Sequence, residues 1–214
     1  SKAAVNMGVK QTGAGSSYVD LAWDAQLGAG HYHTQFSQDG KNWIDMDNSS
    51  SPSESVYNLT QGASYYARVV AYKGSHYTGT HVMIGVSETA IVSTKPTEVS
   101  GLTQTAAGVN SVSMSWNASA GAASYVIYGY INYNWTQIGT SATNSATITG
   151  VAATTSTRFS VAAVKNVTGG TVTGDQCSGV EMKAIPIKVS RIAMQYYWDS
   201  LKEAKYIWTD VNNA

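Results

Sequence analysis

The chain has 214 residues, of which 43% are apolar, and its 13 basic side chains balance 13 acidic ones. Zero net charge, with only 12% charged residues, gives no electrostatic reason to expect nucleic acid or an anionic membrane surface as a partner. No apolar run approaches the roughly 20 residues of a membrane span. Domains commonly have about 100–150 residues, so the length predicts two domains.

Low charge combined with many Ser, Thr, Asn and Gly residues is typical of secreted and cell-surface proteins, so we expect an extracellular location. If the protein is secreted, its signal peptide has been removed or lies outside these residues. The single cysteine, Cys177, excludes an intramolecular disulfide, and packing alone must stabilise the fold. We interpret Cys177 as a small residue at a strand edge rather than as a reactive thiol.

An internal repeat relates the two halves of the chain. Residues 19–24 and 112–117 both alternate apolar and polar side chains, which is the pattern of a half-buried strand, and each segment contains a Trp near its end. The spacing from Trp23 to Trp116 equals that from Tyr32 to Tyr125 and matches the size of one small domain. The repeated unit is therefore a whole domain.

The first unit reads as short strands separated by turns. In chain order, the strands are expected at residues 19–24, 32–36, 43–46, 55–59, 65–72 and 85–94. Asp39 and Gly40 are expected to form a hairpin turn, and Pro96 ends the unit because proline cannot continue a ladder. Many short strands with regular turns and no helix indicate a β-sandwich.

One stretch of the first unit carries a family resemblance. Leu59 is followed by Thr-Gln-Gly-Ala-Ser and Tyr65, and then by a β-rich run containing Arg68, Val69 and Ala71. This stretch resembles the E–F corner and F strand of a fibronectin type III domain. The resemblance implies that Tyr65 forms the tyrosine corner of that family.

The resemblance extends over residues 3–96. Trp23 resembles the core Trp of the family's B strand, and Tyr32 the core Tyr of its C strand. The second unit keeps Trp116 and Tyr125, but Thr157 stands where the corner Tyr is expected. This departure concerns the corner hydrogen bond of the second unit and not its fold.

We therefore predict an all-β protein made of tandem seven-stranded fibronectin type III-like (Ig-like) β-sandwiches, with a partial third unit at the C-terminus. Module 1 is expected at residues 1–96, and module 2 at residues 97–187. Residues 188–214 are expected to be a partial third module or an interface tail. Such tandems resemble those of bacterial surface adhesins and of secreted polysaccharide-degrading enzymes.

The tail allows two readings. Residues 195–199 and 204–208 resemble the B and C strands of another copy, since the Ala-x-Tyr at 204–206 matches that at 123–125. An amphipathic helix is the alternative, because apolar residues from Met194 to Val211 fall at helical spacing. The repeat argument does not depend on periodicity and favours strands.

Two strands of a sandwich cannot bury their own apolar face, and an isolated hairpin is marginal in water. Exposed aromatic patches usually mark an interface. The tail is therefore expected to pack on module 2, to be a truncated module, or to self-associate by adding a strand to a neighbouring chain. Its candidate interface residues are Tyr196, Tyr197, Trp198, Tyr206 and Trp208.

All four histidines lie in the first unit. His31 and His33 flank Tyr32, so alternation predicts that both point outward on one face. His76 and His81 lie in the segment that would form the F–G loop, which in the family adjoins the B–C loop next to His31. Imidazole is a common ligand for zinc and copper, so these four residues are a candidate metal site.

Exposed aromatic residues form a second candidate site. Tyr128, Tyr130, Tyr133 and Trp135 gather around the predicted C–C′ hairpin of the second unit, and Tyr128 is expected to face solvent. Planar rings stack on sugars or form hot spots for protein ligands. Tyr77, in the predicted F–G loop of the first unit, is a further ligand-binding candidate.

No phosphate loop, metalloprotease motif or nucleophile elbow occurs, so we predict a protein that is not an enzyme and needs no cofactor. The leading hypothesis is a non-catalytic extracellular binding or spacer segment, as an adhesion or accessory module, with a protein or carbohydrate ligand at the cell surface. A self-assembling structural or filament subunit, whose tail completes a neighbouring chain, is the first alternative. A metal-binding protein using the histidines is the second.

Overall fold

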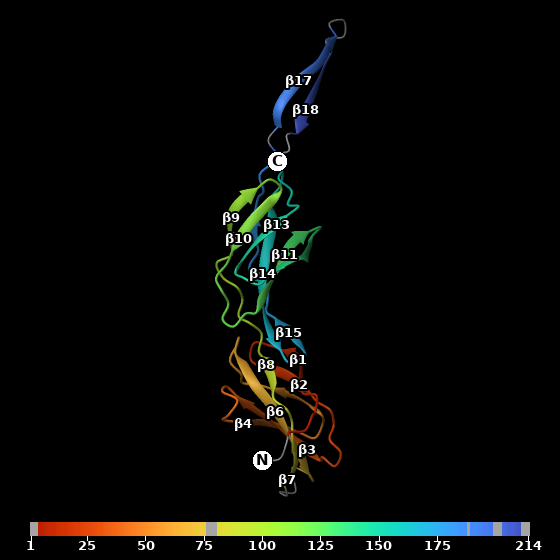
Figure 1. Cartoon of the computed structure of the whole chain (residues 1–214), viewed down its shortest axis with the longest axis vertical. Coiled ribbons are helices and arrows are strands. Elements are labelled where there is room, and N and C mark those ends of the chain that lie inside the picture. The colour runs from red at the N-terminus through yellow and green to blue at the C-terminus, as the bar shows by residue number, and fades with distance from the viewer. Residues whose placement is uncertain (1–3, 76–80, 188, 199–202, 211–214) are drawn as a thin grey trace.

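The computed structural model describes residues 4–75, 81–187, 189–198 and 203–210, and from residue 189 onward it describes the backbone alone. Every regular element among these residues is a β-strand (Figure 1). The all-β prediction is therefore confirmed. None of the described segments forms a helix that is long and apolar enough to cross a membrane.

Module 1 is a sandwich of two antiparallel sheets. The first has the order β1-β2-β5, with β1 at Lys10–Ala14, β2 at Val19–Ala22 and β5 at Ser53–Val56. The second has the order β4-β3-β6-β7, and its strands are β4 (Ile44–Ser49), β3 (His31–Ser37), β6 (Ser64–Lys73) and β7 (Val82–Val86), with β8 (Ala90–Ser93) also on β6. β7 and β8 pair with different parts of β6 and together form the seventh strand in two halves.

Module 2 repeats this arrangement. Its first sheet has the order β13-β10-β9, with β9 at Thr103–Gly108, β10 at Ser111–Ser115 and β13 at Ser145–Thr149. Its second has the order β12-β11-β14-β15, and its strands are β11 (Ser124–Ile131), β12 (Asn134–Ser141), β14 (Thr157–Val167) and β15 (Gly170–Thr173), with β16 (Val180–Met182) also on β14. Both modules therefore have the predicted fibronectin type III-like sandwich.

The strand registers align the two modules residue by residue. Tyr32 pairs with Ala71 between β3 and β6. Tyr125 pairs with Ala163 between β11 and β14, at the same place in the ladder. Positions in the two central strand pairs can therefore be compared directly.

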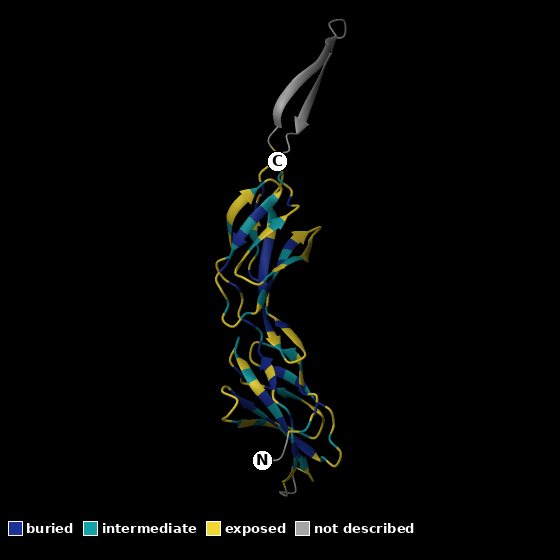
Figure 2. Ribbon diagram, in the orientation of Figure 1, coloured by how far each residue is buried: buried dark blue, intermediate teal, exposed yellow. Residues whose placement is uncertain are grey.

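The buried apolar side chains of the described residues form one core in each module (Figure 2). In module 1 the rings of Trp23 and Tyr32 meet edge to face, with centroids 5.4 Å apart and planes at 66°. Trp116 and Tyr125 repeat this contact at 5.3 Å and 66°. The internal repeat that the sequence showed is thus a repeat of core geometry.

The core tyrosines also hold a loop in each module. The Tyr32 hydroxyl accepts a hydrogen bond from the backbone N–H of Gln26 at 2.9 Å. The Tyr125 hydroxyl accepts the equivalent bond from Ser119 at 3.0 Å. Both bonds tie the loop between the second and third strands to the core.

The tyrosine corner is present in module 1. The backbone N–H of Thr60 donates to the hydroxyl of Tyr65 at 3.0 Å, as the resemblance implied. In module 2, Thr157 is the first residue of β14. Its side chain is too short to span the corner, so only module 1 has this feature.

The seventh strand is interrupted in the same way in both modules. In module 1, Ser87 follows β7; its backbone N–H donates to the Val69 carbonyl at 2.8 Å, and its hydroxyl accepts from the Val69 N–H at 2.8 Å. In module 2, Cys177 makes both contacts with Val161, and the thiol sulfur lies 3.3 Å from the Val161 nitrogen. The buried Cys177 is therefore a structural replacement for a serine.

The modules meet end to end (Figure 1), and backbone groups join them. The Thr168 N–H donates to the Ile91 carbonyl at 2.8 Å, and the Thr168 hydroxyl accepts from the Ile91 N–H at 2.7 Å. A salt bridge between Lys95 and Asp175, with N and O 2.7 Å apart, crosses the same junction. The seventh strand of module 1 is thereby fastened to the turn after β14.

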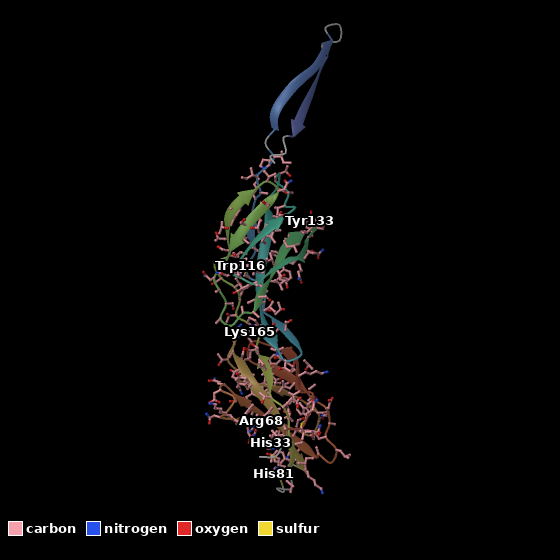
Figure 3. The ribbon with its side chains drawn as sticks, in the orientation of Figure 1. His33, Arg68, His81, Trp116, Tyr133 and Lys165 are labelled. Carbon is pink, nitrogen blue, oxygen red and sulfur yellow. The ribbon has the colours of Figure 1, made fainter. Side chains whose placement is uncertain are left out.

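A buried lysine completes the junction. The side chain of Lys165, only 4% exposed, donates from Nζ to the Gly62 carbonyl and lies 3.4 Å from the Ser64 hydroxyl. Burial lowers the pKa of this ammonium from its ordinary value. The ammonium group of Lys165, which belongs to core strand β14 of module 2, therefore lies in a corner of module 1 (Figure 3).

The C-terminal segment forms the strands β17 (Val189–Trp198) and β18 (Glu203–Asp210). This is the predicted strand reading rather than the helical one. The two strands pair with each other, whereas the second and third strands of modules 1 and 2 lie in different sheets. The tail therefore does not have the arrangement of B and C strands that its sequence suggested.

One predicted turn also differs. Asp39 and Gly40 lie within a longer loop at residues 38–43 rather than forming a two-residue turn. The carboxylate of Asp39 accepts hydrogen bonds from the backbone N–H groups of Lys41 and Asn42, both at 2.8 Å. These bonds, with the Ser37 hydroxyl, hold the pKa of Asp39 well below its ordinary value.

Candidate functional site

The β11–β12 hairpin of module 2 presents the main aromatic surface of the described residues. Tyr130 and Trp135 are a directly opposed pair across the two strands, and their ring centroids lie 5.3 Å apart. Tyr130 is 38% exposed and Trp135 is 37% exposed. Cross-strand aromatic pairs stabilise a hairpin, so this pair also fixes the orientation of both rings.

Trp135 is held from behind by the end of the sheet. A side chain at Gly179 would place its first carbon 2.8 Å from the Trp135 ring and 3.3 Å from the guanidinium of Arg158. The indole therefore packs directly on the Gly179 backbone. One side of the ring is covered and the remainder stays accessible, which makes Trp135 a preorganised contact residue.

Tyr133 occupies the tip of this hairpin (Figure 3) and is 90% exposed. Asn132 and Tyr133 connect the strands with positive φ angles of 49° and 63°. This turn conformation favours Asn followed by Gly, and a bulky residue in the left-handed region is unfavourable. The fold therefore holds a tyrosine in a strained, exposed position, which suggests a function outside the fold.

Tyr128 differs from the other three residues. It pairs with Ser160 on β14 and is half-buried rather than freely exposed. The expectation that it faces solvent is therefore only partly met. The candidate aromatic surface is therefore Tyr130, Tyr133 and Trp135, with Tyr128 at its base.

The structure brings together three of the four histidines. His31 on β3, His33 two residues later and His81 just before β7 have ligand atoms within 4.8 Å of one another. His31 is only 2% exposed, although alternation along β3 predicted that it points outward. It does lie on the outer face, but the stacked ring of Tyr72 and the ring of His81 cover it.

Other expected site residues lie outside the described part of the chain. His76 and Tyr77 fall in the segment 76–80. The side chains of the candidate interface residues on β17 and β18 are not described either; these are Tyr196, Tyr197, Trp198, Tyr206 and Trp208.

The outer face of module 1 contains a polar network beside the histidines. Gln35 accepts a hydrogen bond from the Arg68 guanidinium at 2.7 Å and donates one to Asp45 at 2.6 Å. The guanidinium also lies 4.1 Å from the centroid of a Trp43 ring. Burial lowers the pKa of Arg68, and Asp45 partly offsets this effect.

Of the comparisons with known proteins, only the one with solved structures finds similar chains. No family model matches the sequence, and no curated protein matches it. A segment described as the FN1-FN3 domains of chicken CNTN1 is similar in structure at 14% identity and a TM-score of 0.46, covering 85% of this chain and 68% of that one. A two-domain fibronectin type III segment of chicken tenascin is similar at 17% identity and a TM-score of 0.41, covering 82% and 97%.

A third solved structure, the twitchin kinase region from C. elegans, is similar over 43% of this chain and 17% of that one, at 20% identity and a TM-score of 0.36. Similarity at these levels carries no argument about activity or ligands.

The sequence reasoning missed two contributors to these sites. Lys165 follows four apolar residues at 161–164, and a charged residue ending such a run was the available signal for a junction contact. Gly179 gave no signal, because its role depends on the approach of Trp135, which is distant in sequence.

Proposed function

We propose that the chain is a non-catalytic binding and spacer segment of an extracellular protein, secreted or at the cell surface, in which the β11–β12 hairpin contacts a ligand. The observation that carries this proposal is the rigid aromatic tip. Tyr133 is 90% exposed at a strained position, beside the fixed ring pair of Tyr130 and Trp135. The low charge of the chain supports the extracellular location.

The chemistry of this tip favours an uncharged carbohydrate. Planar rings offer faces on which the apolar side of a sugar ring stacks. The exposed amides of Asn132, Asn134 and Gln137 lie on the same hairpin and can bond sugar hydroxyls. The hairpin from Ser124 to Ser141 contains no charged residue, so it has little charge to select an ionic ligand.

The junction supports the spacer part of the proposal. Backbone bonds between Ile91 and Thr168, the Lys95–Asp175 salt bridge and the Lys165 side chain all join the same two module ends. Several contacts of this kind restrict rotation between modules more than the linker residues alone would. The segment would then hold its binding hairpin at a defined angle and distance from the far end of module 1.

A binding screen tests the carbohydrate ligand. The untagged chain is applied to an array of neutral oligosaccharides, and the best binders are titrated while Trp fluorescence and calorimetry are recorded. We expect Trp135→Ala to abolish measurable binding and Tyr133→Ser to weaken it by about 2- to 10-fold, which is the scale of one aromatic contact.

Tyr57→Ser is the matched control, because Tyr57 is 54% exposed on module 1 and its ring centroid lies 5.5 Å from that of Tyr18. It should bind as the original chain does. Loss of binding in this control, or equal binding by all variants, argues against the hairpin as the contact surface. Binding to a protein partner that depends on the same residues would keep the surface and replace the ligand class.

The backbone of the tail favours a second candidate function, self-association. β17 and β18 form a sheet with each other, and no further described strand pairs with either of them. Both edges of this two-stranded sheet can therefore accept a strand from another copy. On this reading the chain is a subunit of an assembly, joined through residues 188–214.

Light scattering after size exclusion distinguishes this candidate. The full chain is compared with a chain that ends at Ile187, at matched micromolar concentrations. A full chain heavier than a monomer beside a monomeric shortened chain supports strand addition through the tail. Two monomers reject self-association and leave the binding and spacer function as the sole proposal.

A further inference from the structure

The outer face of module 1 brings imidazole groups from two separated segments to one place. His31 and His33 share a face of β3 because side chains alternate along a strand. His81 reaches the same spot from the start of β7, which pairs with the far end of β6. The ring centroids lie 5.1 Å apart for His31 and His81, and 5.9 Å apart for His33 and His81.

We propose that His31, His33 and His81 bind one Zn²⁺ ion, with a fourth coordination position open to water or to a ligand. The candidate ligand atoms of the three residues all lie within 4.8 Å of one another. Between two of these rings, His31 Nε2 and His81 Nδ1 lie 3.1 Å apart. Two nitrogens of a tetrahedral zinc site are separated by about 3.3 Å, given metal–nitrogen distances of about 2.0–2.1 Å.

The backbone fixes the nitrogen that His31 would offer. Nδ1 of His31 lies 2.8 Å from the Gly74 carbonyl, which can only accept, so Nδ1 carries the proton. In the neutral ring, Nε2 is then the nitrogen that carries the lone pair, and it accepts a hydrogen bond from His81 Nδ1 at 3.1 Å. Zinc-bound histidines usually donate their other N–H group in this way, which orients the ring and raises its basicity.

The Gly74 carbonyl can reach His31 because residue 30 has no side chain. A carbon added at Gly30 would collide with the carbonyl oxygen of Gly74. The Gly30 N–H also donates to the Tyr72 carbonyl at 2.8 Å, which ties this loop to β6. The hydrogen bond that orients the His31 ring thus depends on two loops that the fold brings together, one at Gly30 and one at Gly74.

The ring of Tyr72 packs against two of the three histidines. Its ring stacks on His31 with centroids 5.1 Å apart and planes at 10°, and it lies 4.9 Å from the His33 ring. His31 is buried, His33 is half-buried and His81 is exposed. The burial therefore decreases in one direction, so an ion held by the three nitrogens would meet solvent on the side of His81.

Module 2 shows that the sandwich does not need these residues. The ladder positions equivalent to His31 and His33 are Ser124 and Val126, because Tyr125 corresponds to Tyr32. The position equivalent to Tyr72 is Val164. The same fold is built with no imidazole there, so the cluster is an addition to module 1 rather than a requirement of its packing.

Zinc titration of the untagged full chain tests the proposal, with calorimetry and a competing chelator. We expect one Zn²⁺ per chain, and no comparable binding of Mg²⁺ or Ca²⁺, which prefer oxygen ligands. His33→Gln and His81→Gln should each weaken binding by about 100-fold or more, since even outer supports of a zinc site are worth about 10- to 100-fold. Gln35→Ala, which alters the next outward residue of β3, is the control and should bind normally.

Two further measurements check that the zinc binds at these histidines in the folded protein. Co²⁺ should give the intense visible absorption of a four-coordinate ion, and this absorption should disappear in His81→Gln. Free Zn²⁺ at 100 times its dissociation constant should raise the unfolding midpoint of module 1 by about 10 °C, and leave that of module 2 in place. If His31→Gln fails to fold, the exposed His81 variant decides, with its circular dichroism as proof of folding.

The proposal is overturned if zinc binds no tighter than millimolar, or if both His33→Gln and His81→Gln bind as well as the original chain. Neither result bears on the aromatic hairpin of module 2, which the carbohydrate screen tests separately.

Discussion

Modules 1 and 2 have the same interior and different exteriors. Trp23 with Tyr32, and Trp116 with Tyr125, make the same ring contact at nearly the same distance and angle. The outer faces differ, with histidines on module 1 and an aromatic hairpin tip on module 2. Both modules keep the same interior residues because packing between them stabilises the fold. The outer positions can differ, so they can carry side chains that bind a ligand.

The junction shows the same contrast at a single ladder position. Lys165 and Lys73 are equivalent residues of β14 and β6, since Ala163 corresponds to Ala71. Lys165 is buried against module 1, whereas Lys73 is exposed. Lys165 lies at the end of module 2 that meets module 1, whereas no other described module contacts the end of module 1 that carries Lys73.

The largest expected effect tests the equivalence of the two cores. Trp23→Ala and Trp116→Ala should each destabilise their own module by about 3–5 kcal/mol, because both leave a cavity beside the paired tyrosine. Scanning calorimetry should show one lowered transition in each variant, belonging to a different module. A much smaller loss in one of them would show that the shared geometry hides unequal packing.

A substitution at the junction should have the next largest effect. Lys165→Met removes the donor to the Gly62 carbonyl and should cost about 1–3 kcal/mol of coupling between the modules. Small-angle scattering should show a wider range of module orientations. Lys73→Met is the matched control and should change neither measurement. An unaltered scattering profile for Lys165→Met would mean that the remaining contacts suffice to hold the junction.

The Ser87 and Cys177 positions sharpen the comparison. Cys177→Ser should fold with little change, because module 1 already uses a serine there. Cys177→Ala should lose about 1–2 kcal/mol, since the buried N–H of Val161 is left without its side-chain acceptor. Denaturant unfolding measures both. Equal stability of the two variants would show that a side-chain acceptor at this position contributes nothing.

A pH effect should belong to module 1. Burial alone would raise the pKa of Glu88, but backbone N–H groups, including those of Met7 and Val9, lower it overall. A carboxyl group with a lowered pKa in the folded state adds stability at neutral pH that is lost as the pH falls through that pKa.

Glu88→Gln should therefore cost about 1 kcal/mol at pH 7, and its disadvantage should shrink in acid. Unfolding curves between pH 7 and pH 3 measure this. A constant difference across that range would contradict the assignment.

The smallest expected effect has the opposite sign. Tyr133→Gly relieves a left-handed tyrosine at the hairpin tip, and should stabilise module 2 by about 0.5 kcal/mol after the greater freedom of glycine in the unfolded chain is counted. The same variant should lose affinity for the ligand of module 2. A loss of stability would mean that the ring of Tyr133 makes packing contacts that favour the fold.

The repeat could be read from the sequence because its signals are local. Alternation around Trp23 and Trp116 identified the half-buried strands, and the stretch from Leu59 to Tyr65 identified the corner that the Thr60–Tyr65 bond confirms. The strand reading of the tail followed from the same repeat. Its pairing did not, because pairing depends on which strand lies alongside and not on a strand's own pattern.

The sites were predictable only as sets of residue types. Sequence placed the histidines and the hairpin aromatics in two modules, and His31 on an outer face, but it did not predict the burial of His31 under Tyr72 and His81.

By itself, the sequence determined the fold class, the duplicated Trp–Tyr core and the choice of side chains at the exposed tips, because these depend on periodicity and turn chemistry within short stretches. The tertiary structure alone decided that Tyr72 and the Gly74 carbonyl support His31, that Cys177 replaces a serine and that Lys165 enters module 1. Each of these depends on contacts between residues far apart in the chain, and such contacts are set by strand register and by the approach of whole modules.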